Sequence, residues 1–158
     1  NKVVCDDQGF IVGLNLVNQN LAGTLPPNLT DVFPYMRFAI LSHNRIQGTV
    51  SADYANLLIL RLDNNRLTGT IPSELIQSTS LTSLMLGFNG FTGVGKFPSS
   101  FVHTLWDSLG LQDIPFEKGS IPSELFRLTK LSILLLGRTK LTGSVPSELA
   151  LLTELQYL

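Results

Sequence analysis

The stretch RLDNNRLTGTIPSEL, residues 61–75, returns in similar form as LLGRTKLTGSVPSEL at residues 135–149, with the same residue at eight of fifteen positions. Glycines at a regular interval mark further copies of the same unit: Gly23, Gly48, Gly69, Gly93, Gly119 and Gly143. Their spacings are 25, 21, 24, 26 and 24 residues. Self-similarity with a period of about 20–50 residues is typical of solenoid proteins. The chain therefore consists of repeats of roughly 24 residues.

Pairs of apolar residues, two positions apart, occur in each unit. They are Leu14/Leu16, Ala39/Leu41, Leu60/Leu62, Leu84/Leu86, Leu109/Leu111 and Leu134/Leu136. This period of two predicts a short strand with one buried face. One unit is too small to bury that face alone, so the units must stack. The stacked strands are expected to form one parallel sheet.

Polar and turn-forming residues follow each strand in a fixed order. An asparagine stands inside three units, at Asn44, Asn65 and Asn89, and we expect its amide to bond backbone groups of the next coil. The glycine allows a tight turn. The motif PSEL, at Pro72, Pro122 and Pro146, predicts a short helical turn on the opposite side, with serine as N-cap and glutamate in the first turn.

The stretch LLILRLDNNRLTGTIPSEL, residues 57–75, resembles the plant-type leucine-rich repeat, LxxLxxLxLxxNxLxGxIPxxL, nearly position for position. The resemblance extends over essentially the whole chain. It implies an α/β repeat fold: a right-handed solenoid with a concave parallel β-sheet and short 3-10 or helical turns on the convex side. It also implies that residues 1–12 end an N-terminal cap and that residues 13–158 hold six repeats and the start of a seventh.

The single cysteine, Cys5, cannot form an intrachain disulfide. It is a free thiol or pairs with a residue outside the sequence. The resemblance implies the second, because a cysteine near the end of the family's cap pairs with one upstream. The sequence starts at Asn1 and stops as a seventh strand begins, so we expect a piece of a longer protein. A signal peptide could precede it and a membrane span could follow it.

Composition and spacing argue against several classes of function. Charged residues make up 15% of the chain and the net charge is -1, so no basic stripe for nucleic acid is expected. No apolar run approaches the roughly 18–20 residues of a membrane span. His43 and His103 are far apart, and the carboxylates recur once per repeat, at Glu74, Glu124 and Glu148. We therefore expect no enzyme, no metal site and no cofactor.

Strand residues that alternate with the buried leucines should point out of the concave face. Apolar residues gather there on three adjacent units, with Arg61 among them: Phe38, Ile40, Ile59, Met85 and Phe88. Exposed apolar clusters with aromatic and arginine anchors are typical of partner surfaces. The pattern favours a protein- or peptide-recognition module of a larger receptor-like or secreted signalling protein. The alternative is that these side chains merely cover one another.

The triplet Asn28-Leu29-Thr30 is an N-glycosylation sequon. With the resemblance, it favours an extracellular or cell-surface protein, and a cytoplasmic location is the alternative. Two other functions stay open. A secreted hydrolase inhibitor would use the same concave face, although only Asp63 and Asp113 make that face acidic. An ice- or surface-binding solenoid would use the residues after each glycine, which are Thr24, Thr49, Thr70, Val94, Ser120 and Ser144.

Three units depart from the regular length or pattern. The second is three residues short between Tyr54 and Leu57, and the fourth has two extra residues in GVGKFP, residues 93–98. The fifth has Ile114 and Pro115 where the asparagine is expected, and one extra residue before its glycine. These departures are either tolerated variation or a redirected loop that helps to form a site.

Overall fold

The computed structural model describes residues 2–92, 95–99, 101 and 105–158. Its main sheet has the strand order β1-β2-β4-β6-β8-β10-β11. These strands are β1 (Val3–Cys5), β2 (Ile11–Asn15), β4 (Phe38–Ile40), β6 (Ile59–Arg61), β8 (Ser83–Met85), β10 (Ser108–Gly110) and β11 (Ile133–Leu135). β1 runs antiparallel to β2, and the other neighbours are parallel. The predicted parallel sheet is confirmed.

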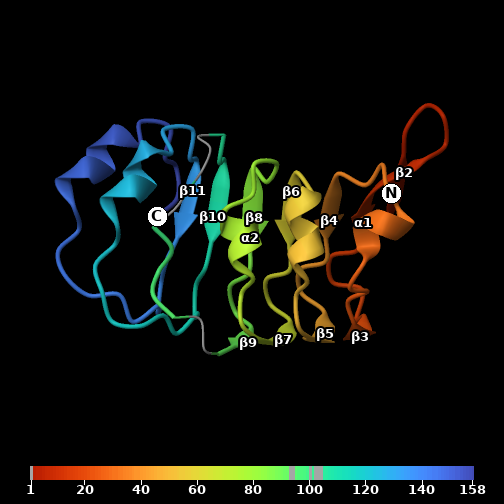
Figure 1. Cartoon of the computed structure of the whole chain (residues 1–158), viewed down its shortest axis with the longest axis horizontal. Helices are drawn as coiled ribbons and strands as arrows, with labels where there is room; N and C mark the ends of the chain where they lie inside the picture. Colours follow the sequence, from red (N-terminus) through yellow and green to blue (C-terminus); the bar gives the residue numbers. More distant parts are fainter. Residues whose placement is uncertain (1, 93–94, 100, 102–104) are drawn as a thin grey trace.

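The coils of the solenoid lie side by side in Figure 1, and we number them by their strand in the main sheet. Coil 1 contains β2, and coils 2 to 6 contain β4, β6, β8, β10 and β11. An isolated parallel bridge joins Tyr157 to Ile133 beyond coil 6. The repeat residues Gly93 and Val94 and the histidine His103 lie outside the described residues.

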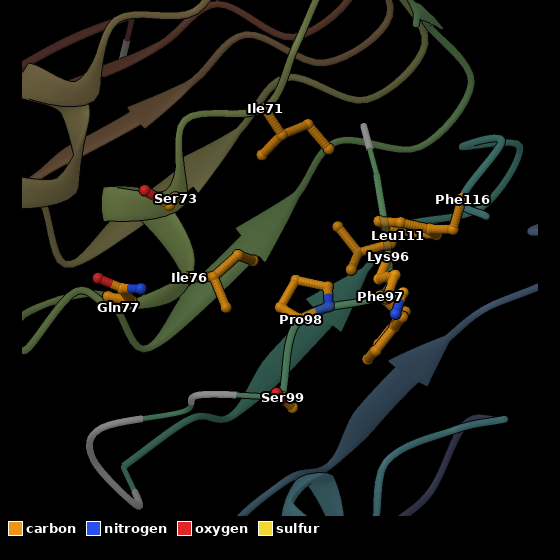
Figure 2. Close-up of a pocket in the computed structure, with 10 residues that line it drawn as sticks. All are labelled: Ile71, Ser73, Ile76, Gln77, Lys96, Phe97, Pro98, Ser99, Leu111 and Phe116. Carbon is orange, nitrogen blue, oxygen red and sulfur yellow. The ribbon is translucent and has the colours of Figure 1, made fainter. Parts of the chain in front are cut away.

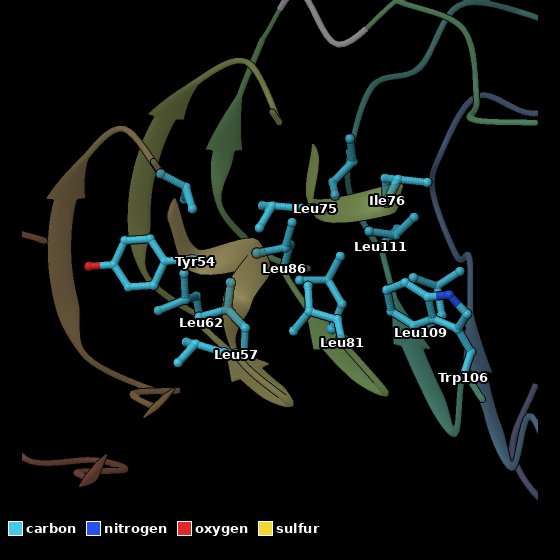
Figure 3. Packing of buried hydrophobic residues seen from close by; sticks show 14 of the residues in the cluster. Tyr54, Leu57, Leu62, Leu75, Ile76, Leu81, Leu86, Trp106, Leu109 and Leu111 are labelled. Carbon is cyan, nitrogen blue, oxygen red and sulfur yellow. The ribbon is translucent and has the colours of Figure 1, made fainter. Parts of the chain in front are cut away.

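One hydrophobic core runs through the coils behind the main sheet. Leu60, Leu62, Leu84 and Leu86 are fully buried, and Figure 3 shows Leu62 and Leu86 among the core residues of neighbouring coils. In coil 1, by contrast, Leu14 and Leu16 are only half-buried, because a repeat coil packs on one side and the strand β1 on the other. Stacking therefore buries the apolar pairs, as the repeat pattern predicts.

Short helices cover the convex side of the core. They are α1 (Leu29–Val32), η1 (Ala52–Asn56), α2 (Ser73–Ile76), η2 (Ser123–Arg127) and η3 (Ser147–Leu151), where η denotes a 3-10 helix. The PSEL motifs begin three of them, which confirms the predicted turns. The prediction that serine is the N-cap residue was wrong. The proline holds the N-cap position, and the serine is the first helical residue and makes no capping bond.

Coil 2, which has no proline at this position, caps its helix differently. The side chain of Ser51 accepts a hydrogen bond from the backbone N–H of Asp53 at 3.2 Å. The buried Tyr54 hydroxyl donates to the carbonyl of Pro26 in coil 1 at 2.8 Å. Burial raises the pKa of the Tyr54 phenol, and the nearby Asp53 carboxylate raises it further, so Tyr54 stays a neutral donor.

The asparagines form a ladder that ties each of coils 2 to 4 to the coil before it. The Asn65 Oδ1 accepts from the Ile46 N–H at 3.0 Å, and Nδ2 donates to the carbonyls of Leu41 and Leu62, both at 3.0 Å. Asn44 and Asn89 repeat this arrangement. The prediction that the amide serves the next coil was therefore wrong, because the unpaired backbone groups that face it belong to the preceding coil and to its own.

A second parallel sheet lies along the lower edge of Figure 1 and was not predicted. It consists of β3 (Ala22–Thr24), β5 (Arg45–Gly48), β7 (Arg66–Gly69) and β9 (Gly90–Phe91). Its glycines Gly23, Gly48 and Gly69 have positive φ angles, which only glycine adopts without strain. Thr24 ends β3, and Thr49 and Thr70 directly follow β5 and β7.

The second sheet ends after coil 4. Residues 111–119 of coil 5 are all described and contain no strand. Pro115 occupies the position at which Arg45 and Arg66 begin their strands, and proline has no N–H to donate to a ladder. The neighbouring Ile114 replaces the ladder asparagine and is buried instead. Coils 4 and 5 are therefore joined on this side by apolar packing and by the hydrogen bond from the Glu117 N–H to the Gly95 carbonyl, 2.8 Å long.

Candidate ligand-binding face

The outer, concave face of the main sheet carries two rows of side chains. Strand register aligns the first row as Gly13, Phe38, Ile59, Ser83, Ser108 and Ile133, and the second as Asn15, Ile40, Arg61, Met85, Gly110 and Leu135. Five residues singled out in the sequence thus lie together on β4, β6 and β8: Phe38, Ile40, Ile59, Arg61 and Met85. We call these five residues and Phe88 the concave patch.

Every member of the concave patch is half-buried. The Phe38 ring lies over Gly13 of coil 1, where a Cβ atom would collide with it. Met85 leans the other way over Gly110, with its Sδ and Cε 2.7 Å from the position of a Cβ on that glycine. The large side chains therefore rest on glycines of neighbouring strands, which spreads the patch from coil 1 to coil 5 and leaves part of each side chain accessible.

Polar groups surround the centre of the patch. The Arg61 Nε donates to the Ser83 Oγ at 3.4 Å, which holds the guanidinium over the sheet. Asp63 accepts hydrogen bonds from the Ser42 hydroxyl at 2.6 Å and the Asn64 amide at 3.0 Å. The His43 Nε2 lies 3.9 Å from the Asp63 Oδ2. One positive and one negative group are thus fixed close to an apolar surface.

Phe88 lies just beyond the strand of coil 4 in a left-handed backbone conformation, with φ 57°. The corresponding position of other coils holds Asn18, Asn64 and Asp113, which are also left-handed. Asparagine and aspartate tolerate this conformation, whereas for a bulky phenylalanine it costs roughly 1–2 kcal/mol. A hydrogen bond from the Phe88 N–H to the Gln112 carbonyl, 3.1 Å long, holds the turn.

Arg138 of coil 6 is a contact residue that the sequence-based patch missed. Its Cζ lies 5.4 Å from the centroid of the Phe88 ring, a cation–π contact that reaches across coil 5. Both residues occupy the same column of the repeat, two coils apart, and this periodicity could have identified the pair. Phe88 and Arg138 extend the polar and aromatic border of the face toward the C-terminal coils.

These residues provide recognition groups and no catalytic arrangement. Among the described residues, no three of the histidine, cysteine, aspartate and glutamate side chains come together as metal ligands. The described part of the chain also contains no helix of the length and apolar character that a bilayer crossing requires. The face offers an aromatic and aliphatic surface with an arginine at its centre and charged groups at its border.

Asn28 and Cys5 lie away from the concave patch. Asn28 is exposed at the N-cap position of α1. The backbone N–H of Thr30, the third residue of the sequon, donates to the Asp53 Oδ2 at 3.0 Å. Cys5 is exposed on β1 and is a free thiol here. Glycosylation at Asn28 and a disulfide at Cys5 stay predictions.

Comparison with known proteins adds the class of molecule. The family model described as "Leucine Rich Repeat" matches residues 56–77. The Arabidopsis thaliana receptor protein-tyrosine kinase CEPR1 is 33% identical over 103 residues, which are 62% of this chain and 10% of that protein. The Arabidopsis thaliana serine/threonine-protein kinase BRI1-like 1 is 32% identical over 140 residues, which are 71% of this chain and 12% of that protein.

Two solved structures are similar over 99% of this chain. The Arabidopsis receptor kinase HAESA, in complex with the peptide hormone IDA and the co-receptor SERK1, matches with a TM-score of 0.83 and 32% identity over 27% of its chain. The ectodomain of the Arabidopsis thaliana receptor kinase GASSHO1/SCHENGEN3, in complex with Casparian strip integrity factor 2, matches with a TM-score of 0.82 and 30% identity over 19% of its chain.

The solenoid, its asparagine ladder and these relatives define the class: a leucine-rich repeat module. The chain is a leucine-rich repeat protein of the plant type, similar to the ectodomains of plant receptor kinases. It spans about a tenth of the length of the curated relatives named above, at 10% and 12%.

Proposed function

We propose that this chain is part of the extracellular recognition domain of a receptor-like protein and binds a protein or peptide through the concave patch. The observation that carries the proposal is the contiguous apolar surface on β4, β6 and β8, with Arg61 at its centre. A surface of this composition is typical of protein recognition because aromatic, aliphatic and arginine side chains provide most of the contact energy.

Similar proteins support a peptide as the ligand. The HAESA structure contains a peptide hormone, and the structure of PEPR1 with AtPEP1, at 26% identity and a TM-score of 0.75, is also similar. Receptor-like protein 35 of Arabidopsis thaliana is 32% identical over 83 residues, 51% of this chain and 8% of that protein. These relatives favour a cell-surface receptor-like protein over a secreted inhibitor of a hydrolase.

The binding mechanism is preorganisation. The main sheet fixes the row Ile40, Arg61 and Met85 through backbone pairing on both sides. The rigid backbone and the bond from Arg61 to Ser83 reduce the freedom that the face loses on binding. An extended ligand could therefore use most of its contact energy for affinity.

Alanine substitution of Phe38, Ile59, Arg61, Met85 or Phe88 is expected to weaken ligand binding while the fold is retained. Residues at the centre of an interface lose about 1–3 kcal/mol on truncation, so the Kd should rise roughly tenfold to hundredfold for the strongest contacts. The ligand is first selected from a library of synthetic secreted peptides on the immobilised chain. Titration calorimetry then gives the Kd for each variant, and circular dichroism verifies the fold.

The matched control is Asn15→Ala, because Asn15 belongs to the same row as Arg61 but lies outside the concave patch and is exposed. Its Kd should stay within about twofold of the wild type. A selected peptide that binds all five patch variants as tightly as the wild type would contradict the assignment of the patch.

Glycosylation of Asn28 during secretion can be tested independently of ligand binding. Expressed with a signal peptide in a eukaryotic secretory host, the chain is expected to lose mass on treatment with an N-glycan-cleaving amidase. Asn28→Gln and Thr30→Ala should each abolish that mass difference, because both remove the sequon. An unglycosylated secreted wild type would contradict the prediction.

A further inference from the structure

A pocket of about 300 Å³ opens on the convex flank where the second sheet ends. Three coils supply its apolar wall, as Figure 2 shows: Ile71 and Ile76 from coil 3, Phe97 and Pro98 from coil 4, and Leu111 and Phe116 from coil 5. Ile76, Phe97, Leu111 and Phe116 are buried residues of the core cluster. The pocket is therefore an opening into the hydrophobic core and belongs to a different side of the molecule from the concave patch.

The irregular repeats produce this pocket. The extra residues of coil 4 displace its proline, so that Pro98 and Phe97 stand beside α2 of coil 3. In coil 5 the change from asparagine to Ile114 removes the polar ladder, and Phe97 packs edge-on against Phe116 with ring centroids 5.1 Å apart. An aromatic cluster thus takes the place of the asparagine-mediated hydrogen bonds between these coils, and its surface remains open to the outside.

The border of the pocket is polar, and of the described residues Lys96 is the one charged residue that lines it, beside Ser73, Gln77 and Ser99. Two carboxylates lie near this border: Glu74 accepts a hydrogen bond from the Ser73 hydroxyl at 3.3 Å, and Glu117 lines the adjoining cavity together with Lys96. Lys96 is exposed and forms no ion pair with the described residues. The wall therefore favours a ligand with an apolar body. Lys96 and the polar side chains at the border favour a negatively charged group on that ligand, with atoms that accept hydrogen bonds.

We propose that this pocket binds a small molecule with an apolar body and one acidic group that is ionised at neutral pH. The apolar body would fill the space between Ile76, Pro98 and Phe116, and the acidic group would lie beside Lys96. A volume of about 300 Å³ is at the lower limit of small-molecule sites, so a compact ring system fits better than a long chain. This proposal does not depend on the function of the concave patch.

Two fluorescent probes that share one ring system test the proposal on the whole chain. The anionic probe is 8-anilinonaphthalene-1-sulfonate, and its neutral counterpart is N-phenyl-1-naphthylamine. We expect saturable binding of the anionic probe at one site per chain, measured by fluorescence titration. Absence of saturable binding to the wild type would overturn the proposal.

Blocking variants locate the site. Ser73→Phe at the pocket border should weaken binding of both probes about tenfold or more, because the new ring occupies the cavity. Ser123→Phe is the matched control, since Ser123 is the same PSEL residue in coil 5 and does not line this pocket. Ser99→Phe blocks the opposite wall and serves as a second variant. If both blocking variants bind the probes like the wild type, the probes bind elsewhere and the assignment fails.

A charge variant tests the acidic group. Lys96→Met should weaken the anionic probe about 1.5-fold to fivefold, the range for an exposed charge pair, and leave the neutral probe unchanged. Lys2→Met removes an exposed lysine far from the pocket and should change neither affinity. Equal affinity of the anionic probe for Lys96→Met and the wild type would overturn the proposed charge recognition.

Discussion

Leu62→Ala is expected to lower the free energy of unfolding by about 2–5 kcal/mol. Leu62 is fully buried in coil 3, with packed coils on both sides, so the surrounding side chains cannot collapse into the space that the substitution leaves. The cost combines the lost burial of the side chain with the cavity that remains. Denaturation in guanidinium chloride, followed by circular dichroism, measures the change.

Leu58→Ala is the matched control for this effect. Leu58 lies four residues earlier in the same coil, but 41% of its surface is exposed. The same deletion there should cost only about 1 kcal/mol, because part of the side chain is already in contact with water and no closed cavity forms. Equal losses of unfolding free energy for the two variants would contradict the conclusion that the alternating leucines form the core.

Asn65→Ala is expected to cost about 1–3 kcal/mol, although the side chain is polar. The substitution leaves the Ile46 N–H without its acceptor and removes one of the two asparagine donors to each of the carbonyls of Leu41 and Leu62. The unsatisfied backbone N–H accounts for most of the cost, because the two carbonyls keep their bonds to Asn44 and Asn89. The same denaturation experiment measures this loss.

Gln19→Ala provides the comparison within the repeat, because Gln19 occupies the corresponding position of coil 1. It is exposed, and its Nε2 donates to carbonyls of its own coil, at Val17 and Asn18. Its replacement should cost about 0.5 kcal/mol or less. If Asn65→Ala were equally mild, the asparagine ladder would not be a major source of stability.

Much of the fold follows from the period of the sequence. Each strand of the main sheet in coils 2 to 6 begins one residue before its apolar pair. The register follows because the first residue of the apolar pair lies nine residues before the glycine in every unit except the fifth, where it lies ten residues before. The outward position of Phe38, Ile40 and Arg61 follows from that alternation alone. Local repetition is sufficient here because every coil contacts mainly its neighbours.

The second sheet and the finer contacts of the face could not be read in the same way. The strands β5 and β7 are recognised by backbone pairing, and their side chains, such as Arg45 and Thr68, show no apolar alternation. The repeat places Arg138 and Phe88 in the same column, but their contact depends on side-chain directions across three coils. The convex pocket depends on how the two irregular units, coils 4 and 5, pack together. The repeat pattern predicts the packing of regular units only.

The ending of the second sheet at coil 4 has a mechanical consequence. Coils 1 to 4 are bonded along two walls, whereas coils 4 and 5 share the main sheet through β8 and β10 but have no second-sheet strand pair among the described residues. On the open flank the Glu117 N–H donates to the Gly95 carbonyl at 2.8 Å. In the described part of the chain beyond coil 4, neighbouring strands are therefore paired on the concave wall alone. Resistance to bending is expected to be greater in coils 1 to 4, which are bonded along two walls, than in coils 5 and 6.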